Sequence, residues 1–314
     1  MKNFVSVIGG INLDVKGISE KENLSADSYI GRIKFSPGGV ARNISENLAR
    51  LNIPVYLFGC AGTDANGQFV IDKTHSAGVN TDHIKAADKI PTSCYLSISD
   101  NSGNLVSAVN DMRDSLNLVS PEYIEEKKEI LEKSKIIVAD TNLQKETLEK
   151  VITIGNENNI PVFIDTVSSE KSLSVNEVEG RIDLLSPNEN EYKKIFGEFN
   201  VDKVALELDM LKYKKFKSII LKRGEKGVVF IDTEKMKVKF FNSIKLEAIE
   251  PNGAGDAFNA GFLYGVMNKY DYYDCVELGI CASYFALKSE NSVPENLTEE
   301  NLLKLYKRKI QNEF

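Results

Sequence analysis

The chain has 314 residues, of which 42% are hydrophobic and 27% charged, and its 46 acidic and 39 basic side chains give a formal net charge of −7. This balance is typical of a globular protein that buries a large core, and its acidity argues against nucleic acid or an anionic membrane as the main partner. The four cysteines and two histidines lack the spacing of a zinc site or disulfide framework, and no apolar run reaches the ~20 residues of a membrane span. We therefore expect a cytoplasmic protein.

The N-terminal part of the chain combines strands with one clear helix. The predicted strands cover residues 4–8, 13–16, 29–35, 55–58, 94–99 and 104–109. From residue 39 the apolar positions recur at helical spacing, which predicts a helix to about residue 52. Asp64 is expected to cap a second helix, and Gly103 suits the turn of a hairpin between the last two strands.

After residue 121, strands and helices alternate regularly. The predicted helices cover residues 122–133, 144–158, 189–196, 203–211, 255–268, 273–288 and 298–311, and the predicted strands cover residues 136–139, 161–164, 184–185 and 218–221 with a hairpin over 228–241. Such alternation predicts a mostly parallel sheet with helices on both faces. The extended segments at about 13–36 and 92–112 fall outside it, and we expect them to form a small antiparallel β-sheet lid on a single domain spanning residues 1–314.

The segment Asn252-Gly-Ala-Gly-Asp-Ala-Phe-Asn259 carries the strongest chemical signal. Small residues let a loop approach a ligand closely, and the helix that follows offers free backbone N–H groups and the positive end of its dipole. The N–H groups of Gly253, Ala254, Gly255 and Asp256 would neutralise a phosphoryl group in transit, while the Asp256 carboxylate would accept the proton of an attacking hydroxyl. The other possibility for this segment alone is a capping aspartate after a tight turn.

Two further segments suggest contacts to a substrate. In Ser36-Pro-Gly-Gly-Val-Ala-Arg-Asn43, Gly38 and Gly39 would let the backbone approach a ligand, and the Asn43 amide could bind its hydroxyls. In Gly9-Gly-Ile-Asn-Leu-Asp14, Asn12 and Asp14 follow the first strand, and ligands of open α/β sheets bind beyond the carboxyl ends of strands. A carboxylate such as Asp14 can accept both hydroxyls of a sugar diol.

Two segments farther along the chain suit a nucleotide. Asn188 and Glu191 are three residues apart and share a helix face, where Glu191 could orient waters on Mg²⁺. Lys222-Arg-Gly-Glu-Lys-Gly227 suits a turn beside a nucleotide. The sequence contains no G-x-x-x-x-G-K-[ST] segment, which excludes a P-loop enzyme. It also has no G-x-G-x-x-G after its first strand, so it lacks the motif of a dinucleotide-binding domain.

Together and in this order, these motifs resemble the ribokinase (PfkB) family over nearly the whole chain. The resemblance implies a three-layer αβα sandwich with a mostly parallel central sheet and a β lid, ATP and Mg²⁺ as co-reactants, and Asp256 as the catalytic base. It also implies that Asp14, Gly39 and Asn43 hold the sugar, that Glu191 serves the metal, and that the ATP site is lined by Asn188, Lys222, Gly224 and Gly227.

Four segments, which include parts of the lid strands, are similar to those of the bacterial pseudouridine kinases of this family. The similarity lies in residues 34–50, 93–104, 109–112 and 138–142. It implies phosphorylation of the 5′-hydroxyl of pseudouridine, and we predict extra polar contacts to this substrate from Asn110 and Asn142. Glu250-Pro251 replaces an Asp-Thr pair that helps to form the monovalent-cation site of ribokinase, which leaves K⁺ dependence open.

Two alternatives remain. The protein could phosphorylate ribose, fructose or another nucleoside, or it could be a non-catalytic nucleoside-binding protein that keeps the fold. By analogy with similar folds, a homodimer through the lid is also expected, with Tyr29 and Ile33 on its apolar face.

Overall fold

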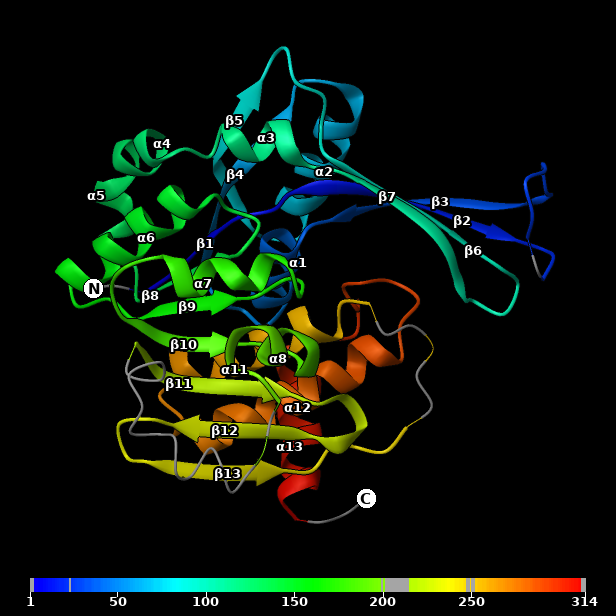
Figure 1. The fold of residues 1–314 in the computed structure, drawn as a ribbon. Coiled ribbons are helices and arrows are strands. Elements are labelled where there is room, and N and C mark those ends of the chain that lie inside the picture. The colour runs from blue at the N-terminus through cyan, green and yellow to red at the C-terminus, as the bar shows by residue number, and fades with distance from the viewer. Residues whose placement is uncertain are drawn as a thin grey trace.

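The computed structural model describes residues 3–22, 24–198, 200, 215–246, 249 and 252–311. Its centre is a nine-stranded sheet in the order β13-β12-β11-β10-β9-β8-β1-β4-β5 (Figure 1). The strands are β1 (Val5–Ile8), β4 (Val55–Gly62), β5 (Asn80–Ala87), β8 (Ile136–Asp140), β9 (Val162–Asp165), β10 (Ile182–Ser186), β11 (Phe216–Lys222), β12 (Val228–Asp232) and β13 (Lys237–Phe241). All neighbours from β11 to β5 pair in parallel, whereas β12 and β13 form an antiparallel edge.

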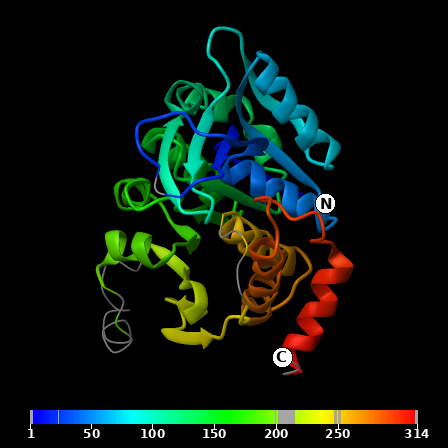
Figure 2. The ribbon, with the colours of Figure 1, turned by 90° about the vertical axis from the view of Figure 1, so that its right-hand side faces the viewer.

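Helices cover both faces of this sheet, as the turned view shows (Figure 2). The longer helices on one face are α1 (Val40–Arg50), α2 (Ala65–Ser76), α11 (Ala254–Met267), α12 (Tyr272–Leu287) and α13 (Glu299–Ile310). The other face carries α4 (Pro121–Glu126), α5 (Lys128–Leu131), α6 (Lys145–Glu157), α7 (Ser174–Glu177) and α8 (Glu189–Phe196). Successive residues of β8 supply the two cores in turn, since Val138 packs on the first face while Ile137 and Ala139 pack on the second. The predicted sandwich is confirmed.

Helix α11 lies deep in the first layer. A Cβ on Gly261 would stand 2.6 Å from the Leu278 carbonyl oxygen and from the Ala282 Cβ, so the missing side chain lets α11 and α12 pack closely. All residues from Ala257 to Gly265 are buried. The first turn of α11 is therefore held in place by the core behind it.

A separate four-stranded sheet in the order β3-β2-β6-β7 extends from the body (Figure 1). Its strands are β2 (Asn12–Ser19), β3 (Gly31–Gly38), β6 (Cys94–Ser99) and β7 (Leu105–Asp111), which agrees with the two predicted lid segments. The expectation of a purely antiparallel lid is wrong at one pair, because β2 and β6 run parallel. Each hairpin leaves the body along its first strand, and these two first strands are neighbours.

Several local predictions differ from the structure. The helix expected over 122–133 is divided into α4 and α5 at Lys127, whose φ of −98° and ψ of 2° interrupt the helix. Strand β5 and the short helix α3 (Arg113–Asn117) were not predicted, and neither were η1 (Lys171–Leu173) and η2 (Gly224–Lys226). The helix expected over 203–211 lies outside the described residues. The predicted cap of α2 is confirmed, since Asp64 accepts a 2.8 Å hydrogen bond from the Gly67 N–H.

Within the described residues, no helix combines the length and the apolar character that crossing a membrane would require.

Candidate active site

Asp256 lies in the first turn of α11, as the sequence predicts. The chain enters this helix through Gly253, whose φ of 83° is left-handed, and a Cβ there would stand 2.0 Å from the Ser292 carbonyl oxygen. Glycine is therefore required for the tight entry to α11. The first N–H groups of a helix have no intrahelical acceptor, so this turn offers hydrogen-bond donors beside a carboxylate.

The environment of Asp256 raises its pKa to about 8. Burial is the main cause, and the negative charges of Asp165 and, more weakly, Asp140 act in the same direction. A hydrogen bond from Asn43 and the positive charge of Lys222 oppose them. A carboxylate with its pKa near neutrality can accept a proton from an alcohol more effectively than an ordinary aspartate.

Asn43 in the first turn of α1 contacts this carboxylate directly, with its Nδ2 2.9 Å from Asp256 Oδ2. Two glycines bring α1 to this place. A Cβ on Gly39 would stand 2.2 Å from the Gly10 carbonyl oxygen, and one on Gly38 would stand 2.4 Å from the Asp14 carboxyl group. The Gly-Gly pair therefore packs the start of α1 against the residues that follow β1.

Asp14 forms the lid side of the site. Its Oδ1 accepts a hydrogen bond from Asn12 Nδ2 at 2.5 Å, and burial raises the pKa of Asp14 to about 6. Strand pairing places Asp14 opposite Tyr95 and Tyr95 opposite Asn110, so all three side chains share one face of the lid. Asn110 is exposed there, two strands away from Asp14.

Asn142 lies on the body side. A Cβ on Gly10 would stand 2.8 Å from Asn142 Nδ2, and the Oδ1 of Asn142 accepts a hydrogen bond from the Lys171 ammonium group. No described hydrogen bond links Asn110 or Asn142 to Asp14, Asn43 or Asp256. Their contact with a substrate therefore stays a prediction.

Two aspartates that the sequence analysis did not single out end neighbouring strands. Asp140 of β8 accepts hydrogen bonds from the N–H groups of Gly10 (2.9 Å) and Ala41 (3.1 Å), and thereby ties the first strand to the start of α1. Burial raises its pKa to about 6. Asp165 of β9 accepts hydrogen bonds from Lys222 Nζ (3.2 Å) and Asn259 Nδ2 (2.6 Å). Carboxylates at the ends of adjacent parallel strands are a signal from which both could have been predicted.

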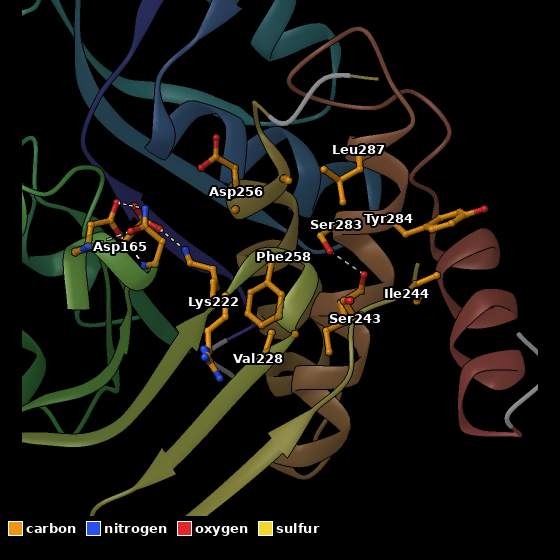
Figure 3. A pocket seen from close by; sticks show the side chains of 18 of the residues that line it. Asp165, Lys222, Val228, Ser243, Ile244, Asp256, Phe258, Ser283, Tyr284 and Leu287 are labelled. Atoms are coloured by element: carbon orange, nitrogen blue, oxygen red, sulfur yellow. Dashed lines mark hydrogen bonds and ion pairs between the residues drawn. The ribbon is translucent and has the colours of Figure 1, made fainter. Parts of the chain in front are cut away.

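Asp256 also lines a cavity of about 380 Å³ (Figure 3). It is lined by all four residues predicted for the ATP site, namely Asn188, Lys222, Gly224 and Gly227, and by Glu191, Ala254, Gly255 and Asp256. Gly253 does not line it. An apolar wall that was not predicted from the sequence comes from the segment after β13 and from α12, and comprises Ile244, Leu246, Ile280, Tyr284 and Leu287. A planar apolar group such as a nucleobase fits a wall of this kind.

Asn188 and Glu191 form a capping box at the start of α8. The Glu191 N–H donates to Asn188 Oδ1 (3.0 Å), and the Asn188 N–H donates to Glu191 Oε2 (2.8 Å). Thr166 Oγ1 also donates to Oε2 at 2.6 Å, and the Asn188 amide donates to Oε1 at 2.7 Å. Both oxygens of Glu191 are thus in use within the protein, which suits a role through water better than direct metal ligation. Its role toward Mg²⁺ stays a prediction.

The described residues contain no group of three or more acidic, histidine or cysteine side chains placed to hold a metal ion. Mg²⁺ in nucleotide sites keeps several waters and relies on phosphate oxygens, so this donor set is compatible with an ion that arrives with a nucleotide. Glu250 and Pro251, which bear on K⁺ dependence, lie outside the described residues.

The chain is similar to known proteins over nearly its whole length. The profile of the pfkB family carbohydrate kinases matches residues 2–298. The pseudouridine kinase of Escherichia coli K12 is 34% identical over 309 residues, covering 97% of this chain and 96% of that enzyme. Among solved structures, Arabidopsis thaliana ribokinase in complex with ribose and ATP has a TM-score of 0.80 at 20% identity, covering 98% of this chain and 99% of that one. An Escherichia coli protein assigned as a ribokinase II, in complex with ATP and Mg²⁺, gives 0.82 at 16% identity, with coverage of 98% and 99%.

These similarities extend over almost the entire chain, and the solved structures share its ribokinase-like fold. The glycine-rich entries to α1 and α11 are the segments that build the site around Asp256. The chain therefore belongs to the pfkB family of carbohydrate kinases, as a sugar or nucleoside kinase.

Proposed function

We propose that the protein transfers the γ-phosphoryl group of ATP to the 5′-hydroxyl of pseudouridine, giving pseudouridine 5′-phosphate and ADP. The observation that carries this proposal is the position of Asp256. Its carboxylate lines the cavity that suits a nucleotide and accepts a hydrogen bond from Asn43, in the helix that begins at the Gly-Gly pair beside Asp14. The 34% identity to the Escherichia coli pseudouridine kinase supports the choice of substrate.

Asp256 acts as the general base in this proposal. The 5′-hydroxyl attacks the γ-phosphorus atom, the bond from that atom to the bridging oxygen of ADP breaks, and the hydroxyl proton passes to Asp256. In this proposal the N–H groups of residues 253–256 would stabilise the charge that develops on the transferred group. Lys222, 3.6 Å from the place of a Cβ on Gly255, adds a positive charge at the same end of the cavity.

The cavity would hold ATP with its base against the apolar wall and its phosphates toward α11. The turn between β11 and β12 supplies Gly224 and Gly227, and a Cβ on Gly227 would stand 1.9 Å from the Phe241 carbonyl oxygen. Asn188 and Glu191 would hold Mg²⁺ through water. The ion would neutralise part of the negative charge of the ATP phosphates.

The pseudouridine ribose would bind between the lid and the body. Asp14 would accept its two secondary hydroxyls, with Asn12 fixing one carboxylate oxygen, while Gly38 and Gly39 let the start of α1 pack close beside Asp14. Asn110 on the lid and Asn142 on the body are the proposed contacts to the base. An amide both donates and accepts, so either residue can satisfy the edge of a uracil-type ring.

The test is ADP release by the purified protein with Mg²⁺ and ATP, comparing pseudouridine, uridine, adenosine, ribose and fructose. We expect turnover with pseudouridine to exceed that with uridine. The two nucleosides differ only in how the base is attached to the ribose, so this pair isolates the contribution of base recognition. Faster turnover of a free sugar would retain the kinase mechanism and reject the proposed substrate. Binding of nucleosides without ADP release from any of them would instead favour a non-catalytic binding protein.

Replacing Asp256 by Asn tests the mechanism separately. We expect kcat to fall by ~10²–10⁴-fold while substrate affinity changes little, because the amide keeps the shape of the side chain and removes the base. Asp72→Asn, an exposed substitution on α2, is the matched control and should retain full activity. An Asp256→Asn variant with wild-type kcat would contradict the assignment.

A further inference from the structure

Arg42 is a buried arginine in the first turn of α1, immediately before Asn43. The residue is only 3% exposed, and its guanidinium group has polar partners on several sides. Nε donates to Thr74 Oγ1 at 3.1 Å, and Nη1 donates to the Pro37 carbonyl oxygen at 3.2 Å. Nη2 forms an ion pair with Glu46, one helical turn farther along. Removing a charged side chain from water carries a large desolvation penalty unless the charge is paired and hydrogen-bonded, as it is here.

One of these contacts determines how Asn43 presents its amide. Arg42 Nη1 donates to Asn43 Oδ1 at 3.0 Å, while Asn43 Nδ2 donates to Asp256 Oδ2 at 2.9 Å. An amide rotated by 180° would place Nδ2 against the guanidinium group and an oxygen against the carboxylate, and both contacts would be repulsive. Arg42 therefore selects the orientation in which Asn43 donates to Asp256.

The charge of Arg42 also acts on the site. It lowers the pKa of Asp14, and it interacts favourably with Asp256. The other charged groups that face Asp256 are Asp165 of β9 and Asp140 of β8, which are negative, and Lys222 of β11, which is positive. Arg42 is thus a positive charge on the α1 side of a site that holds four carboxylates.

Glu46 moderates this charge. Its Oε2 pairs with Arg42, and its Oε1 accepts hydrogen bonds from Arg50 at 2.7 and 3.0 Å. Arg50 approaches Glu46 from the next turn of α1, and no described contact joins it to Asn43. The two arginines therefore share one acidic partner, but only one of them reaches the site.

We propose that Arg42 is a positioning residue for the phosphoryl transfer, fixing the Asn43 amide so that it donates to Asp256 and placing a positive charge on the α1 side of that carboxyl group. This inference rests on the proposed role of Asp256 as base. It assigns to the Glu46–Arg42–Asn43 series a function in addition to stabilising the start of α1.

The kinetic test compares the pH profile of kcat/KM in wild type, Arg42→Gln, Arg42→Lys and Arg50→Gln, with whichever acceptor gives ADP release. A base must be deprotonated to act, so activity rises with pH through the pKa of Asp256 in the free enzyme. Arg42→Gln should move this rise to higher pH, because a positive charge that interacts favourably with the carboxylate is lost. Its kcat at pH 7 should fall by ~10-fold or more.

Arg42→Lys keeps the charge but cannot contact Asn43 and Glu46 together in the planar geometry of a guanidinium group. We expect its rise to stay near the wild-type pH while kcat falls. Arg50→Gln is the matched control, since it removes a cation from the same glutamate without touching Asn43, and both its kcat and its profile should remain close to wild type. A folded Arg42→Gln protein with the wild-type kcat and profile would overturn the proposal.

A second measurement needs no substrate. It compares the thermal stability of Asp256→Asn with that of its parent across pH, in the wild-type and Arg42→Gln backgrounds. The pKa of Asp256 is about 8 in the folded protein and close to the ordinary value of ~3.9 when unfolded. The folded form therefore holds the proton more tightly, and the parent loses stability relative to Asp256→Asn as pH rises from ~4 to ~8. The pH at which the difference levels off reports the pKa of Asp256, and Arg42→Gln should raise it.

Glu46→Gln supplies the opposite change if Arg42→Gln does not fold. It keeps Arg42 and removes the negative charge that moderates it, so the pH at which the difference levels off should fall. An unchanged pH in Glu46→Gln contradicts the proposed charge effect. If no acceptor yields ADP, the proposed function fails, but this stability comparison still decides whether the charge of Arg42 lowers the pKa of Asp256.

Discussion

The Asp256 carboxylate connects two groups of residues that are far apart in the sequence, and most of both groups could be predicted from short motifs. The glycines before α1 and α11 allow close packing or a left-handed backbone, and such positions can be recognised from the local sequence. The direct hydrogen bond from Asn43 to Asp256 could not be predicted from local sequence, because it depends on how α1 and α11 pack. The apolar wall of the nucleotide cavity was missed for a related reason, since Ile280 and Leu287 have the same pattern as core residues of α12.

Asp14 provides a prediction at this scale. Burial raises its pKa to about 6, against the opposing effects of the Asn12 hydrogen bond and the Arg42 charge. Only the ionised carboxylate can accept a hydrogen bond from both hydroxyls of a ribose without competing with its own proton. The KM for the nucleoside should therefore rise as pH falls through about 6, while the KM for ATP changes much less.

The measurement is the KM of the accepted nucleoside between about pH 5 and pH 8. Asp14→Asn is the reference, because its side chain has the same shape and does not titrate. We expect its KM to be higher and to lack this transition. A wild-type KM that stays constant across the range would show that Asp14 does not meet the hydroxyls as a carboxylate.

Among the secondary-structure elements, regular hydrophobic periodicity made the α/β part of the chain predictable. The features that were not predicted depend mainly on pairing between strands that are distant in the sequence. Strand β5 carries an irregular mix of residues, so its alternation is weak, and its place at the sheet edge comes from pairing with β4. The parallel pairing of β2 with β6 joins segments about eighty residues apart, and nothing within either segment specifies it. Lys127 interrupts the predicted helix between α4 and α5 without a proline or glycine, so only the fold shows where the helix ends.

The entry to α11 gives a prediction for a whole element. Gly253→Ala would place a Cβ 2.0 Å from the Ser292 carbonyl oxygen in a residue with φ of 83°. We expect a loss of stability of ~1–3 kcal/mol from strain and steric overlap, together with a kcat at least ~10-fold lower because the N–H groups of the first turn shift. Thermal unfolding and steady-state kinetics measure the two effects.

Gly103→Ala is the control for this change. Gly103 has the same φ of 83°, but nothing lies within 4 Å of the position of its Cβ, at the turn of an exposed hairpin. It should lose ~1 kcal/mol of stability from backbone strain alone and retain its kcat. If both variants keep full activity, the backbone at Gly253 does not position the transferred group.

For the whole molecule, the two faces of the lid suggest its assembly. The row containing Asp14 and Asn110 lies on one face, and the strand register places Ile33, Phe35, Leu96, Ile98 and Val109 on the other. These apolar side chains are 41–68% exposed. An apolar face of this extent on a projecting sheet is unfavourable in water unless another surface covers it.

We predict that a second copy of the chain covers this face, which places the dimer contact on the opposite side of the sheet from the ribose site. Ile33 belongs to the face as the sequence suggested, whereas Tyr29 precedes β3 and hydrogen-bonds to Ser25. Sedimentation velocity should give a dimer for wild type and a monomer for Phe35→Glu, because a buried carboxylate without a partner opposes association. Met236→Glu places the same charge at a 51% exposed apolar residue in the turn between β12 and β13, and it should remain dimeric. A monomeric wild type would instead leave the apolar face of the lid open to solvent, and the lid would then have to close over the nucleoside without support from a partner.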